Sequence, residues 1–197
     1  MTRHEASIPP AYFDGLYHDG NDPWHFATSP YERTKYAATL ASLPRLRYRR
    51  ALEIGCSIGV FTRELAGRCD AVLGLDIAAS AVDAARARCR DLPHVEIAQA
   101  IVPRDWPEGS FDLAVLSEVI YFLDRTDMER LARRVASCLE PGGDVVLVHW
   151  LGETDYPLSG DEAAEGFVAA LGSGWTPMRQ DRTAEYRLDV LGRSGPA

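Results

Sequence analysis

Apolar and polar segments alternate along most of this chain, in a pattern typical of strands that are each followed by a helix. Short, mainly apolar runs predict strands at 51–55, 71–76, 95–98, 111–117 and 145–150. The segments between them predict helices at 60–66, 79–90, 126–140 and 159–171. A closing pair of strands is expected at 175–181 and 185–191, around a short turn.

This order of elements predicts a doubly wound sheet with helices on both faces. Strands that alternate with helices require right-handed crossovers, which make the strands parallel. We therefore expect an α/β fold of three layers, with a Rossmann-like, mostly parallel seven-stranded sheet and an antiparallel C-terminal strand. Such sheets bind ligands at the carboxyl ends of their strands, beside the first strand.

The first 45 residues differ from the rest because they are rich in aromatic side chains. A helix is expected at 30–42, where Ser29 supplies the N-cap, Pro30 the first helical position and Glu32 a contact back to the cap. An earlier helix is expected at 10–17. We interpret the chain as one structural domain, with an N-terminal helical cap or lid at 1–45 and a main part at 46–197.

Two later helices begin with the sequence pattern of a capping box. Thr126 and Glu129 form one such pair, and Ser159 and Glu162 form the other. The segment Pro141–Gly143 is expected to end the first of these helices, because proline and glycine both interrupt helical structure.

The composition indicates a soluble, globular chain with a substantial core. Hydrophobic residues make up 46% and charged residues 25% of the 197 residues, and the formal net charge is −8. Basic residues are dense only at 45–50, just before the first predicted strand and away from the expected ligand edge. A nucleic-acid substrate is therefore disfavoured, because phosphates require a positive face.

Targeting, membrane and metal signatures are not expected in this chain. The first 20 residues hold no apolar core of signal-peptide length, and no apolar run approaches a membrane span, so we expect a cytoplasmic protein. The four cysteines have no Cys-x-x-Cys spacing. We interpret them as core residues in a reducing compartment rather than as a metal site. A monomer or a weak homodimer is expected.

The first two predicted strands carry the clearest functional pattern. The first runs into the turn Gly55-Cys56-Ser57-Ile58-Gly59, and the second ends in Asp76. Glycines let a ligand approach the backbone, and a carboxylate at this spacing can accept hydrogen bonds from both hydroxyls of a ribose. The layout predicts a nucleotide site; the alternative is an ordinary strand-to-helix turn with a surface Asp76.

The turn lacks two glycines of the NAD fingerprint, because Ser57 and Val60 occupy their positions. It resembles instead the first motif of class I S-adenosylmethionine (SAM) methyltransferases, in which an acidic residue precedes the glycine turn. Phe111–Val115, Ser117–Leu123 and Leu139–Gly143 follow in methyltransferase order. The resemblance covers roughly residues 10–192 and implies SAM as cofactor and S-adenosylhomocysteine as product.

Within this class, Asp22–Trp24, Ser29–Arg33, Leu52–Cys56 and Ser117–Leu123 resemble the nodulation protein S family. Those enzymes N-methylate the deacetylated amino sugar of chitin-like oligosaccharides. The resemblance implies a small-molecule or oligosaccharide acceptor with an amine. A small-molecule O-methyltransferase and a non-catalytic SAM-binding module stay open as alternatives, and an NAD-dependent oxidoreductase is a less favoured one.

The same resemblance implies how SAM is held. Glu53 orients the turn and helps to hold the cofactor's ammonium, or it only caps amides of the loop, and Asp76 binds the ribose. Trp24, Tyr31 and Arg33 are expected to form a lid over SAM, in which Arg33 suits the methionine carboxylate; the alternative is plain packing of the N-terminal helices onto the sheet. The full expected set of cofactor-binding residues is Glu53, Gly55, Cys56, Ser57, Gly59, Asp76, Ile77, Ile101, Val102, Ser117, Trp24, Tyr31 and Arg33.

One position departs from the family pattern. Ile101 stands where the family usually has an acidic residue that hydrogen-bonds the adenine amino group. We expect the backbone there to serve the adenine edge while Ile101 packs on the ring, with Gln99 or Asp105 as replacement acceptors.

Two residues are candidates for the chemistry, because each lies at the end of a strand on the expected ligand edge. Glu118 favours positive charge in the reacting partners, or forms a salt bridge with an arginine. His149 is a candidate general base, or a histidine that only shapes the pocket. Tyr121 and Phe122 are interpreted as core residues.

Overall fold

The fold was analysed in a computed structural model, which describes residues 2–18 and 22–194. Its helical elements are α1 (Pro10–His18), α2 (Pro30–Ser42), α3 (Val60–Leu65), η1 (Ala66–Arg68), α4 (Ala79–Cys89), η2 (Ile120–Phe122), α5 (Arg125–Cys138) and α6 (Gly160–Leu171). Its strands are β1 (Tyr48–Ile54), β2 (Cys69–Asp76), β3 (Val95–Gln99), β4 (Phe111–Ser117), β5 (Leu139–Trp150), β6 (Trp175–Arg182) and β7 (Tyr186–Arg193). Residues 1, 19–21 and 195–197 lie outside this description. They belong to the predicted N-terminal cap at 1–45 and to the end of the predicted main part at 46–197.

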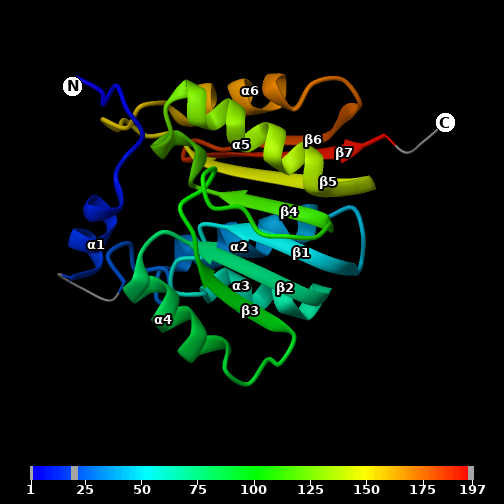
Figure 1. The fold of residues 1–197 in the computed structure, drawn as a ribbon, viewed down its shortest axis with the longest axis horizontal. Coiled ribbons are helices and arrows are strands. Elements are labelled where there is room, and N and C mark those ends of the chain that lie inside the picture. Colours follow the sequence, from blue (N-terminus) through cyan, green and yellow to red (C-terminus); the bar gives the residue numbers. More distant parts are fainter. Residues whose placement is uncertain (1, 19–21, 195–197) are drawn as a thin grey trace.

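The strands form one seven-stranded sheet in the order β3-β2-β1-β4-β5-β7-β6 (Figure 1). The first five strands are parallel, and β7 runs antiparallel to both β5 and β6. The strand order reverses at β1, because the chain proceeds outward to β3 and then returns to β4. The predicted α/β class, the doubly wound topology and the antiparallel C-terminal strand are therefore confirmed.

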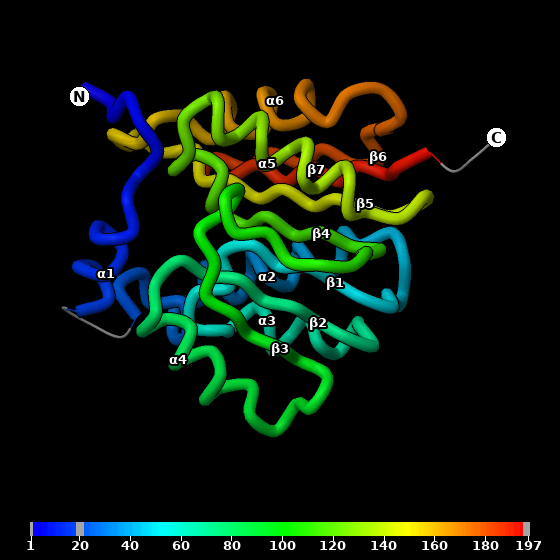
Figure 2. Tube along the Cα trace, viewed as in Figure 1, coloured from blue at the N-terminus to red at the C-terminus, as the bar shows by residue number. Residues whose placement is uncertain are grey.

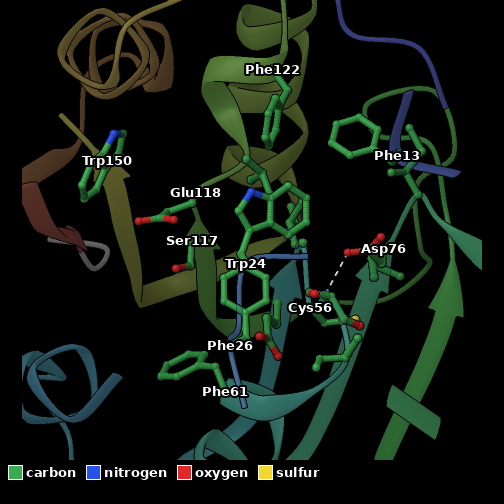
Figure 3. Close-up of a pocket in the computed structure, with 18 of the residues that line it drawn as sticks. Phe13, Trp24, Phe26, Cys56, Phe61, Asp76, Ser117, Glu118, Phe122 and Trp150 are labelled. Carbon is green, nitrogen blue, oxygen red and sulfur yellow. Dashed lines mark hydrogen bonds between the residues drawn. The ribbon is translucent and has the colours of Figure 1, made fainter. Parts of the chain in front are cut away.

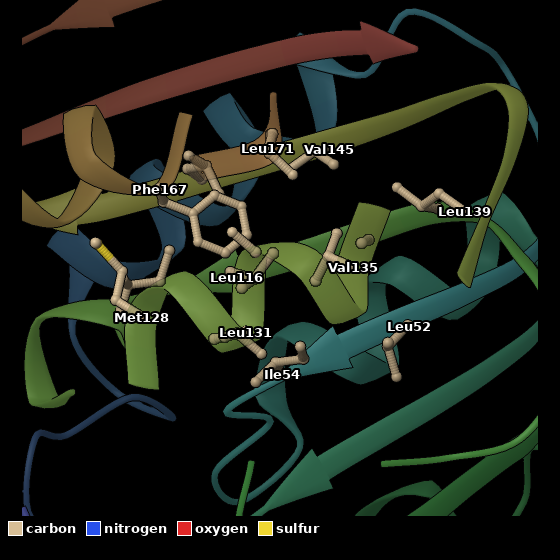
Figure 4. Packing of buried hydrophobic residues seen from close by; sticks show 14 of the residues in the cluster. Leu52, Ile54, Leu116, Met128, Leu131, Val135, Leu139, Val145, Phe167 and Leu171 are labelled. Carbon is tan, nitrogen blue, oxygen red and sulfur yellow. The ribbon is translucent and has the colours of Figure 1, made fainter. Parts of the chain in front are cut away.

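Residue alternation along the strands produces a core on each face of the sheet. Leu52 and Ile54 of β1 pack in the cluster that α5 and α6 cover, whereas Ala51 packs in the cluster that contains Phe61 of α3. Figure 4 shows Leu131 and Phe167 of the two covering helices against the strands of the first cluster. Successive side chains of a strand point to opposite faces, so one apolar run supplies both cores.

Helix α2 begins as the sequence predicts, with Ser29 as N-cap and Pro30 in the first turn. The side chain of Ser159 likewise forms a full capping box with Glu162 at α6. The predicted box of Thr126 and Glu129 is wrong, because the Asp124 side chain accepts from the backbone N–H of Asp127 and begins α5 earlier. An aspartate is as good an N-cap as a threonine, and it stands two residues closer to the preceding turn.

The predicted role of Pro141–Gly143 is also wrong. Helix α5 already ends at Cys138, and the strand expected at 145–150 begins at Leu139 as the longer β5. Leu139 pairs with Phe111, and the ladder shifts register before Leu113 pairs with Asp144. The proline and glycines therefore lie in an irregular start of a strand, where they are tolerated.

The N-terminal segment crosses the edge of the sheet at which the parallel strands end (Figure 2). Ile8, Phe13 and Tyr17 are buried there against Ile58 and the start of α4. All four cysteines are buried and free, as predicted. Within the described part of the chain, no helix is both long enough and apolar enough to cross a membrane.

Substitution of Leu131 by alanine should destabilise the fold strongly, because this α5 side chain is fully buried. We expect the free energy of unfolding to fall by about 2–5 kcal/mol, from lost apolar burial and the cavity that remains. Urea unfolding at a single pH measures the effect. Leu46→Ala is the control, because Leu46 is 91% exposed; equal losses in the two variants would contradict the placement of α5.

Candidate functional site

A cavity of about 400 Å³ lies at the carboxyl ends of β1, β2 and β4, beside the point where the strand order reverses. Figure 3 shows Asp76 on one side of it and Glu118 and Trp150 on the other. The cavity is lined by eleven of the fifteen predicted site residues, namely Trp24, Tyr31, Glu53, Gly55, Cys56, Ser57, Asp76, Ile77, Val102, Ser117 and Glu118. The site is therefore where open parallel sheets bind their ligands.

The turn between β1 and α3 has a backbone that leaves no room for larger residues. Gly55 has a φ of 82°, and a Cβ atom built on it would lie 2.0 Å from Cγ1 of Val119. Ser57 and Glu118 also have positive φ values, of 47° and 59°, although they are not glycines. Non-glycine residues are held in this region where surrounding structure enforces it, which is common at functional sites.

Asp76 is fixed at the end of β2 by the neighbouring backbone. Its carboxylate accepts hydrogen bonds from the N–H of Ser57 at 2.8 Å and of Ala78 at 3.0 Å. Burial raises the pKa of Asp76, and these backbone N–H groups oppose the rise. The arrangement holds an acceptor for ligand hydroxyls in one orientation at the cavity wall.

Glu53 is buried near the end of β1, and its carboxylate has fewer hydrogen-bond donors than that of Asp76. Burial raises the pKa of its carboxyl to about 7, and the negative charge of Asp76 acts in the same direction. Its Oε2 has no hydrogen-bond partner among residues 2–18 and 22–194. A buried carboxylate oxygen without a partner is costly, and a cationic ligand group would satisfy it.

A second polar group lies on the side of the cavity near Glu118. Lys35 Nζ from α2 donates to Glu118 Oε1 at 2.7 Å and to Glu32 Oε1 at 2.9 Å. Burial raises the pKa of Glu118, whereas the ammonium of Lys35 lowers it. The predicted salt bridge of Glu118 thus exists, but its partner is a lysine from the N-terminal segment rather than an arginine.

Aromatic side chains of the N-terminal segment close one side of the cavity. We call Phe13, Tyr17, Trp24 and Phe26 the N-terminal wall, because all four line the cavity. Figure 3 labels Phe13, Trp24 and Phe26 of this wall. The Tyr17 hydroxyl is hydrogen-bonded to the Ser57 side chain, and the Tyr17 and Trp24 rings meet edge to face with centroids 5.8 Å apart. The wall is therefore attached to the glycine turn itself.

The structure contradicts the role of general base for His149. Its side chain is fully buried and does not line the cavity, because alternation along β5 points it toward α6 and leaves Trp150 at the cavity. Burial lowers the pKa of His149 to about 3, so the ring is neutral at physiological pH. The alternative, a histidine that shapes the pocket, does not fit either, because neither ring nitrogen has a hydrogen-bond partner among the described residues and the side chain lies outside the cavity lining.

Three predicted cofactor residues also lie outside the lining of the cavity. Arg33 is exposed, because its position on α2 points away from the face that carries Glu32 and Lys35. Ile101 turns away while Ala100 and Val102 line the cavity, and its N–H donates to Asp105. Gly59 instead caps α3 in a left-handed conformation, a structural role behind the turn.

Sequence reasoning missed several residues that line the cavity. Glu32 and Lys35 lie three positions apart on α2, and a helical projection would have placed them on one face with Tyr31. Tyr121 and Phe122 were predicted to be core residues, yet they line the cavity while also packing in the core. In the described ranges, no three His, Cys, Asp or Glu side chains are grouped to hold a metal ion.

Comparison with known proteins finds methyltransferases among the relatives of this chain. A sequence profile of the methyltransferase domain matches residues 51–143. The chain is 34% identical over 128 residues to nodulation protein S of Rhizobium tropici, an alignment that covers 64% of this chain and 54% of that protein. The chain thus spans about half the length of this curated relative.

Solved structures agree with that comparison. A Pseudomonas syringae protein assigned as a methyltransferase is 37% identical, with a TM-score of 0.73 over 83% of this chain and 99% of that one. The N-methyltransferase NodS from Bradyrhizobium japonicum WM9, in complex with S-adenosyl-L-homocysteine, has a TM-score of 0.79 over 94% of this chain and 99% of that one. At 23% identity, this second likeness shows the fold alone.

Replacement of Glu53 by glutamine should change how stability depends on pH. Because the folded pKa of about 7 lies above the ordinary value of 4.5, the folded protein binds the proton more tightly. This contribution to stability is complete below the ordinary value and is lost as the pH rises through about 7. The free energy of unfolding should therefore fall by roughly 1.4 kcal/mol per pH unit across this window, relative to Glu53→Gln.

Urea unfolding of both proteins at a series of pH values measures this difference. Glu64→Gln makes the same change on the exposed surface of α3 and should keep the slope of the natural chain. Parallel pH profiles for Glu53→Gln and the natural chain would show that Glu53 is ionised throughout.

Proposed function

The chain belongs to the class I SAM-dependent methyltransferases, and we propose that it transfers the methyl group of SAM to the nitrogen of a small-molecule amine. One observation carries the proposal: the cavity is lined by four carboxylates, of Glu32, Glu53, Asp76 and Glu118, against the one ammonium of Lys35. Such a cavity favours cationic occupants. The sulfonium of SAM and the ammonium of an amine acceptor are both cations.

The residues present fit SAM at its polar groups. We propose that the ammonium of its methionine part occupies the position beside Glu53, whose Oε2 lacks a partner in the described chain. Asp76, held by two backbone N–H groups, accepts from the ribose hydroxyls. Ile77 and Val102 offer apolar surface to the adenine ring. Neither Gln99 nor Asp105 lines the cavity, so we do not retain them as acceptors for the adenine amino group.

SAM supplies, when bound, an electrophilic methyl group whose bonding electron pair stays on sulfur as the methyl group leaves. The protein has to orient the acceptor and exclude water, and orientation alone contributes roughly 7–11 kcal/mol to such a step. The N-terminal wall of Phe13, Tyr17, Trp24 and Phe26 covers the cavity with apolar surface. We propose that residues 1–45 act as a lid in this way and residues 46–197 as the cofactor-binding part.

An amine that arrives as an ammonium must lose a proton before its lone pair can attack. We propose Glu118 as the group that accepts this proton, because it lines the cavity and His149 does not. Burial raises the pKa of Glu118, which makes it a stronger base than an exposed carboxylate. Lys35 holds one oxygen of this carboxylate and thereby fixes its orientation.

The relatives named nodulation protein S favour an amino sugar as the acceptor. Tyr121 and Tyr156 stack with ring centroids 5.3 Å apart, and Trp150 also lines the cavity. Such rings pack against the apolar faces of sugars, and their faces attract cations. A neutral hydroxyl as acceptor would bring no positive charge to the carboxylates of Glu32 and Glu118.

Calorimetric titration with S-adenosylhomocysteine, with NAD as control, tests the cofactor. Incubation with methyl-labelled SAM and either D-glucosamine or D-glucose then tests the acceptor, because the two sugars differ at one amine. We expect binding of S-adenosylhomocysteine but not of NAD, and label on glucosamine at least tenfold above glucose. Equal labelling of both sugars would contradict N-methylation, and binding of NAD alone would contradict the cofactor.

Asp76→Asn should weaken the binding of S-adenosylhomocysteine while leaving the fold intact. A hydrogen bond to a charged acceptor is worth about 1.5–3 kcal/mol, which corresponds to a roughly 10- to 150-fold rise in Kd. Calorimetry measures the Kd, and thermal unfolding checks that the Ser57 turn survives. Asp83→Asn, on the exposed surface of α4, is the matched control; an unchanged Kd in Asp76→Asn would exclude Asp76 from the cofactor site.

A further inference from the structure

The end of the cavity near Glu118 contains polar atoms that the fold itself leaves unsatisfied. Glu32 is only 6% exposed, and its Oε2 has no hydrogen-bond partner among the described residues. The buried hydroxyl of Tyr31, one position earlier on α2, also lacks a partner in the part of the chain that the structure describes. Both residues line the cavity. Leaving two buried polar atoms unsatisfied costs stability unless a ligand completes them.

We propose that Glu32 and Tyr31 of α2, together with Glu118, bind the ammonium group of the acceptor, and that Lys35 limits this site to one positive charge. The inference rests on the proposed function, but it assigns recognition of the acceptor to two residues of α2 together with Glu118, which follows the end of β4. It names the acceptor class as monocationic amines.

The charges of the cluster determine how many cations it can take. Lys35 Nζ is shared between Glu32 Oε1 and Glu118 Oε1, and the Tyr31 ring lies 4.9 Å from it. Two carboxylates and one ammonium leave one negative charge without compensation. A bound cation can compensate it at Glu32 Oε2, because that oxygen is buried and has no hydrogen-bond partner among residues 2–18 and 22–194. A single ammonium completes the cluster, whereas an anionic acceptor would add a like charge to a buried site.

The surroundings also indicate the shape of the acceptor. The Tyr31 ring meets the Trp150 ring edge to face with centroids 6.0 Å apart, and Trp150 lines the cavity beside Glu118 (Figure 3). Aromatic rings add attraction for an ammonium and pack against apolar or flat groups next to it. The site therefore suits an amine that is attached to a ring or a short apolar body.

Binding of three probes with one carbon skeleton tests this assignment without any turnover. Benzylamine, benzyl alcohol and benzoate are titrated into the protein by calorimetry, in the presence and in the absence of S-adenosylhomocysteine. We expect benzylamine to bind at least tenfold more tightly than the alcohol and benzoate not to bind. Equal affinity for the amine and the alcohol, or binding of benzoate, would overturn the proposal.

Two variants locate the site. Glu32→Gln keeps the shape of the side chain and leaves Lys35 paired with Glu118, so the fold should survive; benzylamine affinity should fall at least tenfold. Tyr31→Phe, which removes one hydroxyl, should reduce it less. Glu64→Gln on the surface of α3 is the matched control and should leave it unchanged. Unchanged benzylamine affinity in Glu32→Gln would overturn the role of Glu32.

The affinity for S-adenosylhomocysteine distinguishes a failure of the acceptor site from a failure of the proposed function. Glu32→Gln should leave that affinity within about twofold, because the cofactor residues proposed above lie on β1, at the end of β2 and in the loop after β3, and none lies on α2. A natural chain that binds S-adenosylhomocysteine and methylates amines, but shows no effect of Glu32→Gln, would refute this inference and leave the proposed function standing. Failure to bind S-adenosylhomocysteine at all would refute the proposed function itself.

Discussion

The burial of negative charge is the constraint on which the site depends. Four carboxylates surround one cavity, and each is stabilised differently. Asp76 receives backbone N–H groups, and Glu32 and Glu118 share one ammonium. Burial raises the pKa of Glu53 to about 7, although the Thr62 side chain opposes the rise. Ionised groups are rarely buried without compensation, because removing a charged group from water costs far more free energy than removing a neutral side chain. A fold that retains this arrangement has a cavity prepared for positive charge.

The sheet provides the geometry that makes this arrangement possible. Parallel strands direct their carboxyl ends to one edge, so side chains that are far apart in the sequence meet there. The reversal of strand order at β1 leaves a crevice between α3 and the strand ends, and α2 lies along the face that Glu53 shares. The N-terminal segment then covers the crevice, with Tyr17 hydrogen-bonded to Ser57. One domain thus brings strand ends, a helix face and a covering segment into the same small volume.

The sequence predicted the fold and the part of the site that the glycine turn and Asp76 form, and the reason that it predicted no more is physical. Asp76 and the glycine turn are predictable because local strand ends and turns determine where they lie. His149 was assigned wrongly because a shift of one residue along β5 changes the face of the sheet, and only Trp150 reaches the cavity. Glu32 and Lys35 were missed because their place follows from how α2 docks on the sheet, a long-range contact that local patterns do not encode.

The attachment of the N-terminal wall has a consequence for ligand exchange. Phe13 and Tyr17 contact the body of the protein mainly through the small cluster that includes Ile58 and Ala81, separate from the two large cores of the sheet. Segments held by few buried contacts open locally, at a lower free energy than global unfolding. Local unfolding of α1 would thus remove Phe13 and Tyr17 from the N-terminal wall while the sheet stays intact, and Trp24 and Phe26 would remain at the cavity. The free energy of this partial opening would depend on the nine residues of α1 and not on the stability of the whole domain.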